Sequence, residues 1–367
     1  MKRVLLISTV HPATDSRIMY KIVPSLRSGY EVFCALPQLY ASEKRLISLP
    51  RFERLLPRLL FAHPVALVKC LMLRPHIVHI FVPELIPLAL LFQCIGARVI
   101  YEVQENLFKK FAIKTYNNSL IFRVLFKFFD KLARRKFHCI FTDDAYLEEY
   151  TDLAKSSVVI HNYVSLPVID ALGNEAVPVQ RPEFFYLGVV SMERCLDTMI
   201  EALARLKSGY ADFHLHLFGP VRVSSTALKS LPGYQQVAGH ITFHGYTDQK
   251  IAMRVAARAV AGIALLKPVA DYPESLPTKL FEYMALKLPL ITSDFPLYKQ
   301  IVGQAACGFC ISPYDADALC YALEQCMNNG SLRHEMGRNA RKAAETVYNW
   351  ASEEKLLLAF YNNILIS

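Results

Sequence analysis

The chain has 367 residues, of which 53% are hydrophobic and 20% are charged. This length exceeds one ordinary core and fits two domains of about 150–200 residues each, and the apolar content excludes a disordered chain. The sequence has no run of about 18 uninterrupted apolar residues, so it predicts no membrane-spanning helix. The basic N-terminus precedes only five apolar residues, which favours a buried first strand over a signal peptide and predicts a cytoplasmic protein.

Nine cysteines are scattered over both halves, mostly in apolar runs, as reduced core cysteines are. Cys307 and Cys310 form a CxxC pair, but no second pair or histidines at ligand spacing accompany it. The sequence therefore predicts neither a metal site nor a redox motif, and no resident cofactor.

The net charge of +9 is carried by the first half of the chain. Residues 1–160 have a net charge of +10, whereas the remainder has a net charge of −1. Between positions 107 and 138, nine basic residues stand against one acidic residue and are interleaved with eight aromatic ones. This asymmetry predicts an anionic partner or surface for the first half.

Four of these basic residues recur at every fourth position and form one helical stripe, with apolar residues on the other side. Such a basic amphipathic helix with exposed aromatic residues is typical of binding to an anionic membrane surface. The alternative is an ordinary packed helix with a solvated basic face, and nucleic acid is a rival partner without a supporting motif. The residues predicted to face the membrane are Arg123, Lys127, Lys131, Arg135 and Phe128.

Short apolar runs alternate with helix-period segments along the whole chain. A stretch with several prolines and a glycine, 162–183, separates two such series and is predicted as a linker. In the first series we expect a helix over 17–28 and strands over 3–8, 31–36, 77–80, 98–102, 139–142 and 158–160. In the second we expect strands over 184–188, 214–219, 241–245, 261–265 and 290–292, and helices over 197–207, 249–257, 276–286, 316–328 and from 332 onward with a break near 349–350.

Continuous apolar strands separated by helices indicate parallel sheets that are covered on both faces. The predicted fold is α/β, with two doubly wound, Rossmann-like domains that face a cleft. We expect residues 1–165 and a returning helix over about 350–367 to form one domain, and residues 166–349 the other. Ligands of such domains bind beyond the carboxyl ends of the strands.

One segment of the second domain carries the pattern of an anion site. Pro277 stands where a helix is expected to begin and Ser275 is a candidate cap, so free N–H groups and the helix dipole would attract a diphosphate. Glu274 and Glu282 frame this helix start and can accept hydrogen bonds from sugar hydroxyls, and Lys279 offers a counter-charge. The alternative is two solvent-facing acids on a surface helix.

This segment resembles the Glu-x7-Glu motif of the retaining glycosyltransferases of family 4, which have the GT-B fold. The similarity covers nearly the whole chain and is strongest to the bacterial surface-polysaccharide branch. The matching residues are His11-Pro12, Asp15, Arg17-Ile18, Lys21, Gly29 to Val32, Pro83-Glu84-Leu85 with Pro87, Tyr101 to Glu105, Asn162, Tyr186 to Gly188, Arg194, Pro277 to Ala285 and Tyr348 to Trp350.

The resemblance implies transfer of a sugar from a UDP- or GDP-linked donor to a lipid-linked glycan, at the inner face of the cytoplasmic membrane. The product would be a capsule, exopolysaccharide or O-antigen, with polysaccharide-assembly proteins as further partners, and no metal is implied. The implied donor residues are Gly188, Arg194, Glu274, Ser275, Leu276, Lys279 and Glu282; the acceptor-side residues are His11, Asp15, Arg17 and Glu84; and the catalytic residues are Glu274, Gln104 and Glu105.

The sequence also departs from the family pattern. Gln104 stands where the family has histidine, Phe81 and Val82 stand where this branch has His-Asp, and Cys195 and Lys287 replace glycines. A lysine at the end of a helix must avoid the left-handed conformation or accept strain. These departures leave two other hypotheses open: an inactive GT-B protein that acts as a binding subunit of a polysaccharide assembly, and an isomerase like the nucleotide-sugar 2-epimerases.

Overall fold

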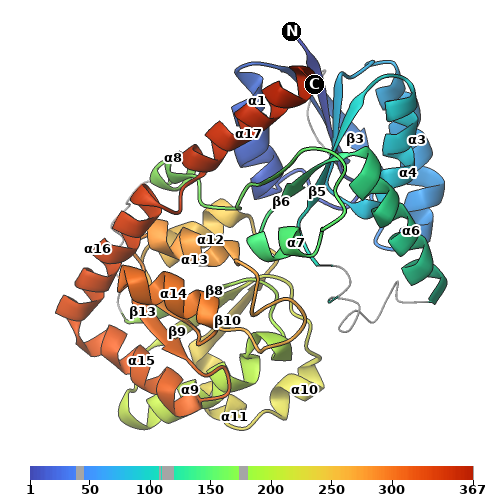
Figure 1. Ribbon diagram of the computed structural model, residues 1–367. Coiled ribbons are helices and arrows are strands. Elements are labelled where there is room, and N and C mark those ends of the chain that lie inside the picture. The colour runs from blue at the N-terminus through green and yellow to red at the C-terminus, as the bar shows by residue number, and fades with distance from the viewer. Residues whose placement is uncertain (39–44, 107–108, 110–119, 173–180, 367) are drawn as a thin grey trace. The chain divides into compact units, whose positions relative to one another are not determined.

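The computed structural model describes residues 1–38, 45–106, 109, 120–172 and 181–366 (Figure 1). The chain divides into two compact units. The first unit comprises Met1–Asn162 and Trp350–Ser367, and the second comprises Tyr163–Asn349. In the described part of the chain, no helix is both long enough and apolar enough to cross a membrane.

The first unit is built on a parallel sheet of seven strands in the order β3-β2-β1-β4-β5-β6-β7. Its central strands are continuous apolar runs, as expected for strands that are buried on both faces. The strands are β1 (Arg3–Ile7), β2 (Glu31–Pro37), β3 (Leu46–Leu49), β4 (Ile77–Ile80), β5 (Arg98–Val103), β6 (His138–Phe141) and β7 (Ser157–Val159).

Helices cover both faces of this sheet, and each face has its own apolar core. The helices α3, α4 and α6 pack on one face, and α1 and the C-terminal helix α17 pack on the other. The helical segments are η1 (Ile18–Ile22), α1 (Val23–Arg27), α2 (Leu55–Pro57), η2 (Arg58–Ala62), α3 (His63–Leu71), η3 (Pro83–Leu85), α4 (Ile86–Cys94), α6 (Leu120–Lys136), α7 (Asp144–Glu148) and α17 (Trp350–Ile366).

Several contacts hold α17 in the first unit. The indole Nε1 of Trp350 donates a hydrogen bond to Ser25 Oγ at 3.0 Å, and the hydroxyl of Tyr361 lies 2.6 Å from His79 Nδ1. Leu357 and Tyr361 are fully buried in the core beneath this helix. The C-terminal helix α17 is thus part of the core of the first unit.

The second unit has a parallel sheet of six strands in the order β10-β9-β8-β11-β12-β13. The strands are β8 (Glu183–Leu187), β9 (His214–Phe218), β10 (Ile241–Gly245), β11 (Ala261–Ala264), β12 (Leu290–Ser293) and β13 (Gly308–Ile311). The helical segments are α8 (Leu166–Asp170), η4 (Met192–Arg194), α9 (Leu196–Gly209), α10 (Ser225–Lys229), α11 (Tyr234–Val237), η5 (Ala238–His240), α12 (Gln249–Ala256), α13 (Thr278–Ala285), α14 (Pro296–Ala305), α15 (Ala316–Asn328) and α16 (Gly330–Thr346).

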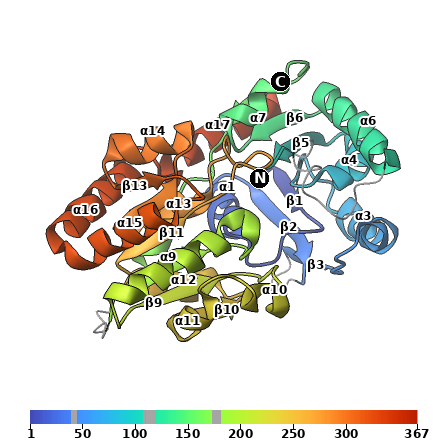
Figure 2. The same cartoon turned by 90° about the horizontal axis from the view of Figure 1, so that it is seen from below.

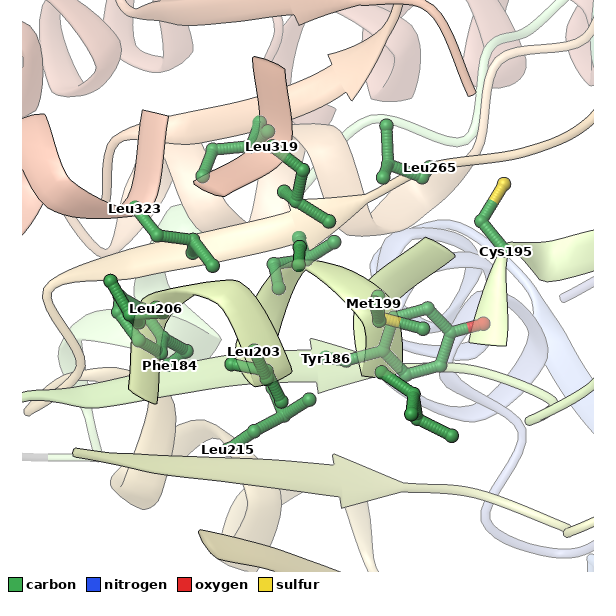
Figure 3. Packing of buried hydrophobic residues seen from close by; sticks show 14 of the residues in the cluster. Phe184, Tyr186, Cys195, Met199, Leu203, Leu206, Leu215, Leu265, Leu319 and Leu323 are labelled. Carbon is green, nitrogen blue, oxygen red and sulfur yellow. The ribbon is translucent and has the colours of Figure 1, made fainter. Parts of the chain in front are cut away.

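Figure 3 shows the core between one face of this sheet and the helices α9 and α15. Met199 and Leu203 of α9 and Leu319 of α15 are buried against the strands. Apolar residues at helical spacing in α9 and α15 supply these contacts, which is the pattern of an amphipathic helix on a sheet.

The predicted α/β architecture of two Rossmann-like domains is confirmed. The expected strands are present to within two residues at each end. The strands β3 and β13 were not predicted, because both are short edge strands whose residues are mostly half-exposed. The boundary between the two units lies between Asn162 and Tyr163, within the predicted linker. The residues that follow belong to the second unit, however, because Val164 pairs with Asn349 and Ile169 of α8 is buried in the core of that unit. Residues 173–180 of the linker lie outside the described part.

Lys287 adopts the left-handed conformation at the end of α13, with φ of +59°. A glycine adopts this conformation without the clash of a Cβ atom. Lys287 is exposed, so we expect Lys287→Gly to raise the free energy of unfolding by about 1 kcal/mol in urea titrations. The control is Lys287→Ala, which keeps the strain and should bring no gain; an equal gain in both variants would contradict this explanation.

Candidate active site

Two glycines hold the carboxyl ends of β8 and β9 unusually close together. Gly188 and Gly219 have φ of +140° and +131°, and the Gly188 amide donates to Phe218 O at 2.8 Å. A Cβ atom on Gly219 would lie 2.0 Å from Gly188 O, and one on Gly188 would lie 3.0 Å from an Nη atom of Arg194. The bare backbone of Gly188 therefore lets the Arg194 guanidinium lie directly against the end of the sheet.

Arg194 shares this position with a second cation, Lys279 of α13. The Lys279 ammonium lies 4.4 Å from the ring centre of Tyr186, and the Arg194 guanidinium lies 5.5 Å from that of Tyr272. Lys279 is only 4% exposed, and its Nζ has no hydrogen-bond partner among the described residues. Burial, together with the nearby charge of Arg194, lowers the pKa of Lys279 well below its usual value. An anion bound beside Lys279 would offset the burial and the charge of Arg194, and would favour the charged form of the amine.

The loop before α13 differs from the prediction at its cap. Pro277 is itself the N-cap residue, because its ψ of 125° keeps it outside the helix, and no side chain among the described residues caps α13. Ser275 lies two residues earlier, and its hydroxyl donates to Tyr272 O at 3.5 Å, so the prediction of Ser275 as the cap is wrong. The hydroxyl of Tyr298 donates to the carbonyl oxygens of Tyr272 and Ser275, both at 3.1 Å, and Leu276 packs on the core.

The two glutamates of the motif differ in their surroundings. Glu282 is buried within α13 and accepts a hydrogen bond from Nε2 of Gln249 at the start of α12. Glu274 is exposed in the turn before α13, where its amide donates to Asp271 O at 3.1 Å. The alternative of two solvent-facing acids is therefore wrong for Glu282. Gln249 was not predicted, because it lies far from the motif in sequence.

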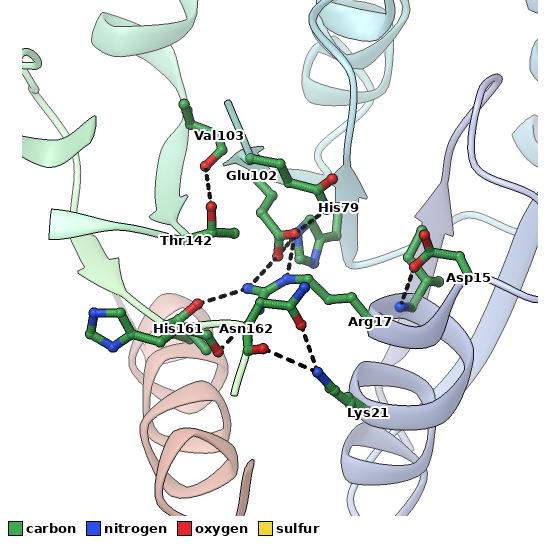
Figure 4. Close-up of polar contacts among 12 residues, drawn as sticks. Asp15, Arg17, Lys21, His79, Glu102, Val103, Thr142, His161 and Asn162 are labelled. Atoms are coloured by element: carbon green, nitrogen blue, oxygen red, sulfur yellow. Dashed lines mark hydrogen bonds and ion pairs between the residues drawn. The ribbon is translucent and has the colours of Figure 1, made fainter. Parts of the chain in front are cut away.

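In the first unit, three side chains contact the buried carboxylate of Glu102 near the carboxyl end of β5. Arg17 donates to both oxygens of Glu102, with N–O distances of 2.8 and 3.2 Å (Figure 4). Nε2 of His79 lies 3.4 Å from Glu102 Oε2, and Nε2 of Gln104 donates to Glu102 Oε1 at 2.6 Å. Burial alone would raise the pKa of Glu102, but the charge of Arg17 and the hydrogen bond from His79 outweigh it and hold the pKa well below its usual range.

Arg17 is not positioned to contact an acceptor, contrary to its predicted role. Its side chain is 3% exposed, and it also donates to the carbonyl oxygens of Ile160 and His161 at 2.9 and 3.2 Å. The neighbouring π-helical turn η1 places Lys21 on the same side, where it donates to Asn162 Oδ1 at 2.7 Å. Arg17 therefore connects the ends of the strands and pairs with the Glu102 carboxylate.

The other acceptor-side residues follow the carboxyl ends of β1 and β4, which are neighbours. Nδ1 of His11 lies 2.8 Å from Ser8 Oγ. Asp15 accepts a hydrogen bond from the amide of Ile18 at 2.8 Å and thereby caps the helix that begins there. Glu84 is paired with Arg58 at 2.9 Å and accepts from Thr9, and burial raises its pKa despite the charge of Arg58.

Gln104 and Glu105 leave the sheet directly after β5. Glu105 is half-buried and lines a small pocket with Asn106, Tyr146 and Glu149. Phe81 and Val82, the residues that replace His-Asp, are instead buried in the core, where Phe81 stacks on His79 with 4.2 Å between ring centres. The structure thus brings Gln104 to Glu102 and buries Phe81 and Val82 in the core.

Glu102 and His79 were not predicted as functional residues. The available signal was a charged residue and a histidine inside apolar runs that form the neighbouring strands β5 and β4. Such residues need partners within the core, and these partners come from distant parts of the chain. Arg58 gave no signal of its own, since it stands among exposed basic residues.

The helix α6 packs on the sheet through Phe126, Asp130 and Ala133. Within the helix, Arg134 forms an ion pair with the buried Asp130 at 2.8 Å. The residues predicted to face a membrane are all exposed: Arg123, Lys127, Phe128, Lys131 and Arg135. In the described part of the chain, no group of three or more candidate ligands could hold a metal ion.

Comparisons with known proteins match most of the second unit to a described family. Residues 172–343 match the family model described as "Glycosyl transferases group 1". The α-D-kanosaminyltransferase of Streptomyces kanamyceticus is 22% identical over 186 residues, which are 50% of this chain and 46% of that protein. The chain thus matches a little less than half the length of this curated relative.

Two solved structures cover nearly all of the chain. Anabaena HepE, solved in complex with UDP-glucose, has a TM-score of 0.70 at 13% identity, covering 99% of this chain and 100% of that one. WaaG, a glycosyltransferase involved in lipopolysaccharide biosynthesis, has a TM-score of 0.70 at 16% identity, covering 96% and 98%. The chain therefore has the two-domain GT-B fold, and its second unit carries the match to the group 1 glycosyl transferases.

Proposed function

We propose that the protein is a glycosyltransferase that moves a sugar from a nucleotide-diphosphate donor to a lipid-linked glycan in surface-polysaccharide biosynthesis. The observation that carries the proposal is the pair of cations Arg194 and Lys279 at the end of β8. Lys279 is buried without a hydrogen-bond partner among the described residues, within the segment that matches the glycosyl transferase family. HepE, which shares the fold, binds UDP-glucose, which supports a UDP-linked donor.

In this proposal the donor binds to the second unit. Arg194, Lys279 and the backbone at Gly188 hold the diphosphate and stabilise the charge that develops on it when the sugar leaves. Glu282 accepts hydrogen bonds from the ribose hydroxyls in place of the Gln249 amide, and Glu274 accepts them from the sugar. The backbone at Ser275 and Leu276 completes the diphosphate site. Fixed cations make a metal unnecessary for the departing diphosphate.

The acceptor binds to the first unit in the proposal, beside His11, Asp15 and Glu84. Nε2 of Gln104 donates its hydrogen bond to Glu102. The side-chain oxygen of Gln104 can therefore accept a hydrogen bond from a hydroxyl of the acceptor sugar. An amide takes up no proton, so Gln104 orients the hydroxyl and Glu105 is the neighbouring group that can accept a proton. Transfer with retention of configuration is part of the proposal and rests on the family 4 resemblance.

We further propose that the protein works as a peripheral protein at the inner face of the cytoplasmic membrane, with the stripe of α6 toward the lipid. WaaG, which acts in lipopolysaccharide biosynthesis, shares the fold and supports a surface-polysaccharide role. The alternative of an inactive binding subunit rests on Gln104, Phe81 and Val82. Cys195 and Lys287 no longer support it, because both keep the positive φ that the family's glycines would have.

Thermal unfolding of the purified protein with UDP, GDP and CDP and their sugars tests the donor site. Ligand at about 100 times its dissociation constant adds roughly 2.7 kcal/mol to the stability of the folded state. We expect a raised midpoint with one nucleotide, and loss of that shift in Glu282→Gln, which keeps the size of the side chain. The control is Glu335→Gln on the exposed face of α16.

The same donor then serves in a transfer assay with a lipid-linked glycan fraction. Nucleotide binding without transfer would favour the inactive binding subunit. Sugar interconversion without an acceptor would favour the isomerase. A midpoint that moves with none of the nucleotides would contradict the proposed donor site.

A further inference from the structure

Exposed apolar side chains are concentrated on one part of the first unit. Of 24 large apolar residues that are exposed in the described chain, fourteen lie in three helical regions of this unit. The first region runs from α2 through η2 to the end of α3, the second is α4 and its end, and the third is α6. The residues are Leu56, Leu59, Leu60, Phe61, Val68, Leu71 and Met72; Leu91 and Ile95; and Leu120, Ile121, Val124, Leu125 and Phe128.

These three regions lie side by side on the same face of the first sheet, as both views show (Figures 1 and 2). The inner sides of the helices are buried in one core through Ala66 and Cys70 of α3, Phe92 of α4 and Ala133 of α6. The exposed apolar residues are therefore on the outer sides. Large exposed apolar patches on a folded protein mark interaction sites.

Basic residues accompany this apolar surface, and acidic ones are nearly absent from it. Arg51, Arg54 and Arg74 are exposed around the first region, in addition to the basic stripe of α6. Of the acidic residues in these segments, Glu84 is paired with Arg58 and Asp130 is buried with Arg134, which leaves Glu53 exposed. In the described residues, this surface thus combines apolar area with an excess of positive charge over negative charge.

We propose that α2, η2 and α3, with the outer sides of α4 and α6, form a single surface that inserts into an anionic lipid bilayer. A bilayer presents anionic headgroups above an apolar layer, which is the complement of this surface. Leu56, Leu60 and Met72 enter the boundary between headgroups and acyl chains, while the arginines reach the phosphates. The inference deepens the proposed membrane association of α6 by adding an apolar contribution from a second region.

Vesicles of equal parts phosphatidylethanolamine and phosphatidylglycerol test the surface in a flotation assay with the full chain. Leu56 and Leu60 are 65% and 57% exposed, so Leu56→Gln with Leu60→Gln should leave the fold intact. We expect this variant to bind the vesicles about tenfold or more weakly than the wild type, because two apolar side chains no longer leave water. The control is Tyr321→Gln with Val347→Gln in the second unit, where the exposed fractions are 58% and 54%.

Salt separates the apolar contribution from the electrostatic one. At high salt the headgroup attraction is screened, so the wild type should retain part of its binding and the Leu56→Gln, Leu60→Gln variant should lose it. Unchanged binding in this variant would overturn the proposal, and so would a dimer in light scattering that the variant dissociates. The nucleotide-dependent shift in thermal unfolding, measured without vesicles, reports separately on the donor site and so distinguishes failure of the two proposals.

Discussion

Replacing Lys279 by methionine is expected to abolish binding of the donor nucleotide and, at the same time, to stabilise the unliganded protein by about 1–2 kcal/mol. The buried ammonium has no hydrogen-bond partner among the described residues and lies near the charge of Arg194. Replacing a buried charge by an apolar side chain of similar length removes its desolvation penalty. The diphosphate, in contrast, loses one of its two proposed cations.

The sign of the pH dependence follows from the lowered pKa of Lys279. Between this pKa and the value of about 10.4 in the unfolded chain, the unfolded state binds more protons, so the stability of the wild type rises with pH. Lys279→Met should lack this rise. Urea titrations over this range, with Lys229→Met on exposed α10 as the control, provide the measurement. Equal pH profiles for wild type and Lys279→Met would contradict a buried, uncompensated lysine.

Glu102→Gln is expected to destabilise the protein by about 3–5 kcal/mol, which is the usual effect of breaking a buried ion pair. The variant leaves the Arg17 guanidinium buried without its counter-charge and disturbs His79 and Gln104, which also contact Glu102. Denaturant titration measures the change. Arg17→Met combined with Glu102→Gln should recover part of the loss, because it removes the unpaired charge.

The carboxylate of Glu102 has a lowered pKa in the folded protein, so its contribution is present above the unfolded value of about 4.3. That contribution is lost as the pH falls toward the lowered pKa. The loss of stability in acid should therefore be smaller in Glu102→Gln than in the wild type. The control is Glu31→Gln at a half-exposed carboxylate of β2. A Glu102→Gln variant as stable as this control would show that the buried network does not support the fold.

Much of the fold was predictable from the pattern of apolar runs. Strands such as β4 and β11 are short apolar runs with no exposed face, so they stand out from the helix-period segments around them. The edge strands β3 and β13 lack this signal, because one side of each has no neighbouring strand and their residues are partly exposed. β3 pairs with β2 and β13 pairs with β12, so each edge strand depends on its contact with a neighbouring strand and not on its own residues alone.

The α/β class and the segment around Lys279 and Glu282 could be predicted before folding was considered, because these depend on periodicity and on neighbouring residues. The burial of Lys279 near Arg194, the ion pair of Arg17 with Glu102 and the exposure of the apolar residues of α6 became known from the folded structure. Burial and charge pairing arise from residues far apart in the chain, so a local pattern carries no record of them. Residue type therefore determines which groups a site contains, whereas folding determines how deeply they are buried and with which charges they pair.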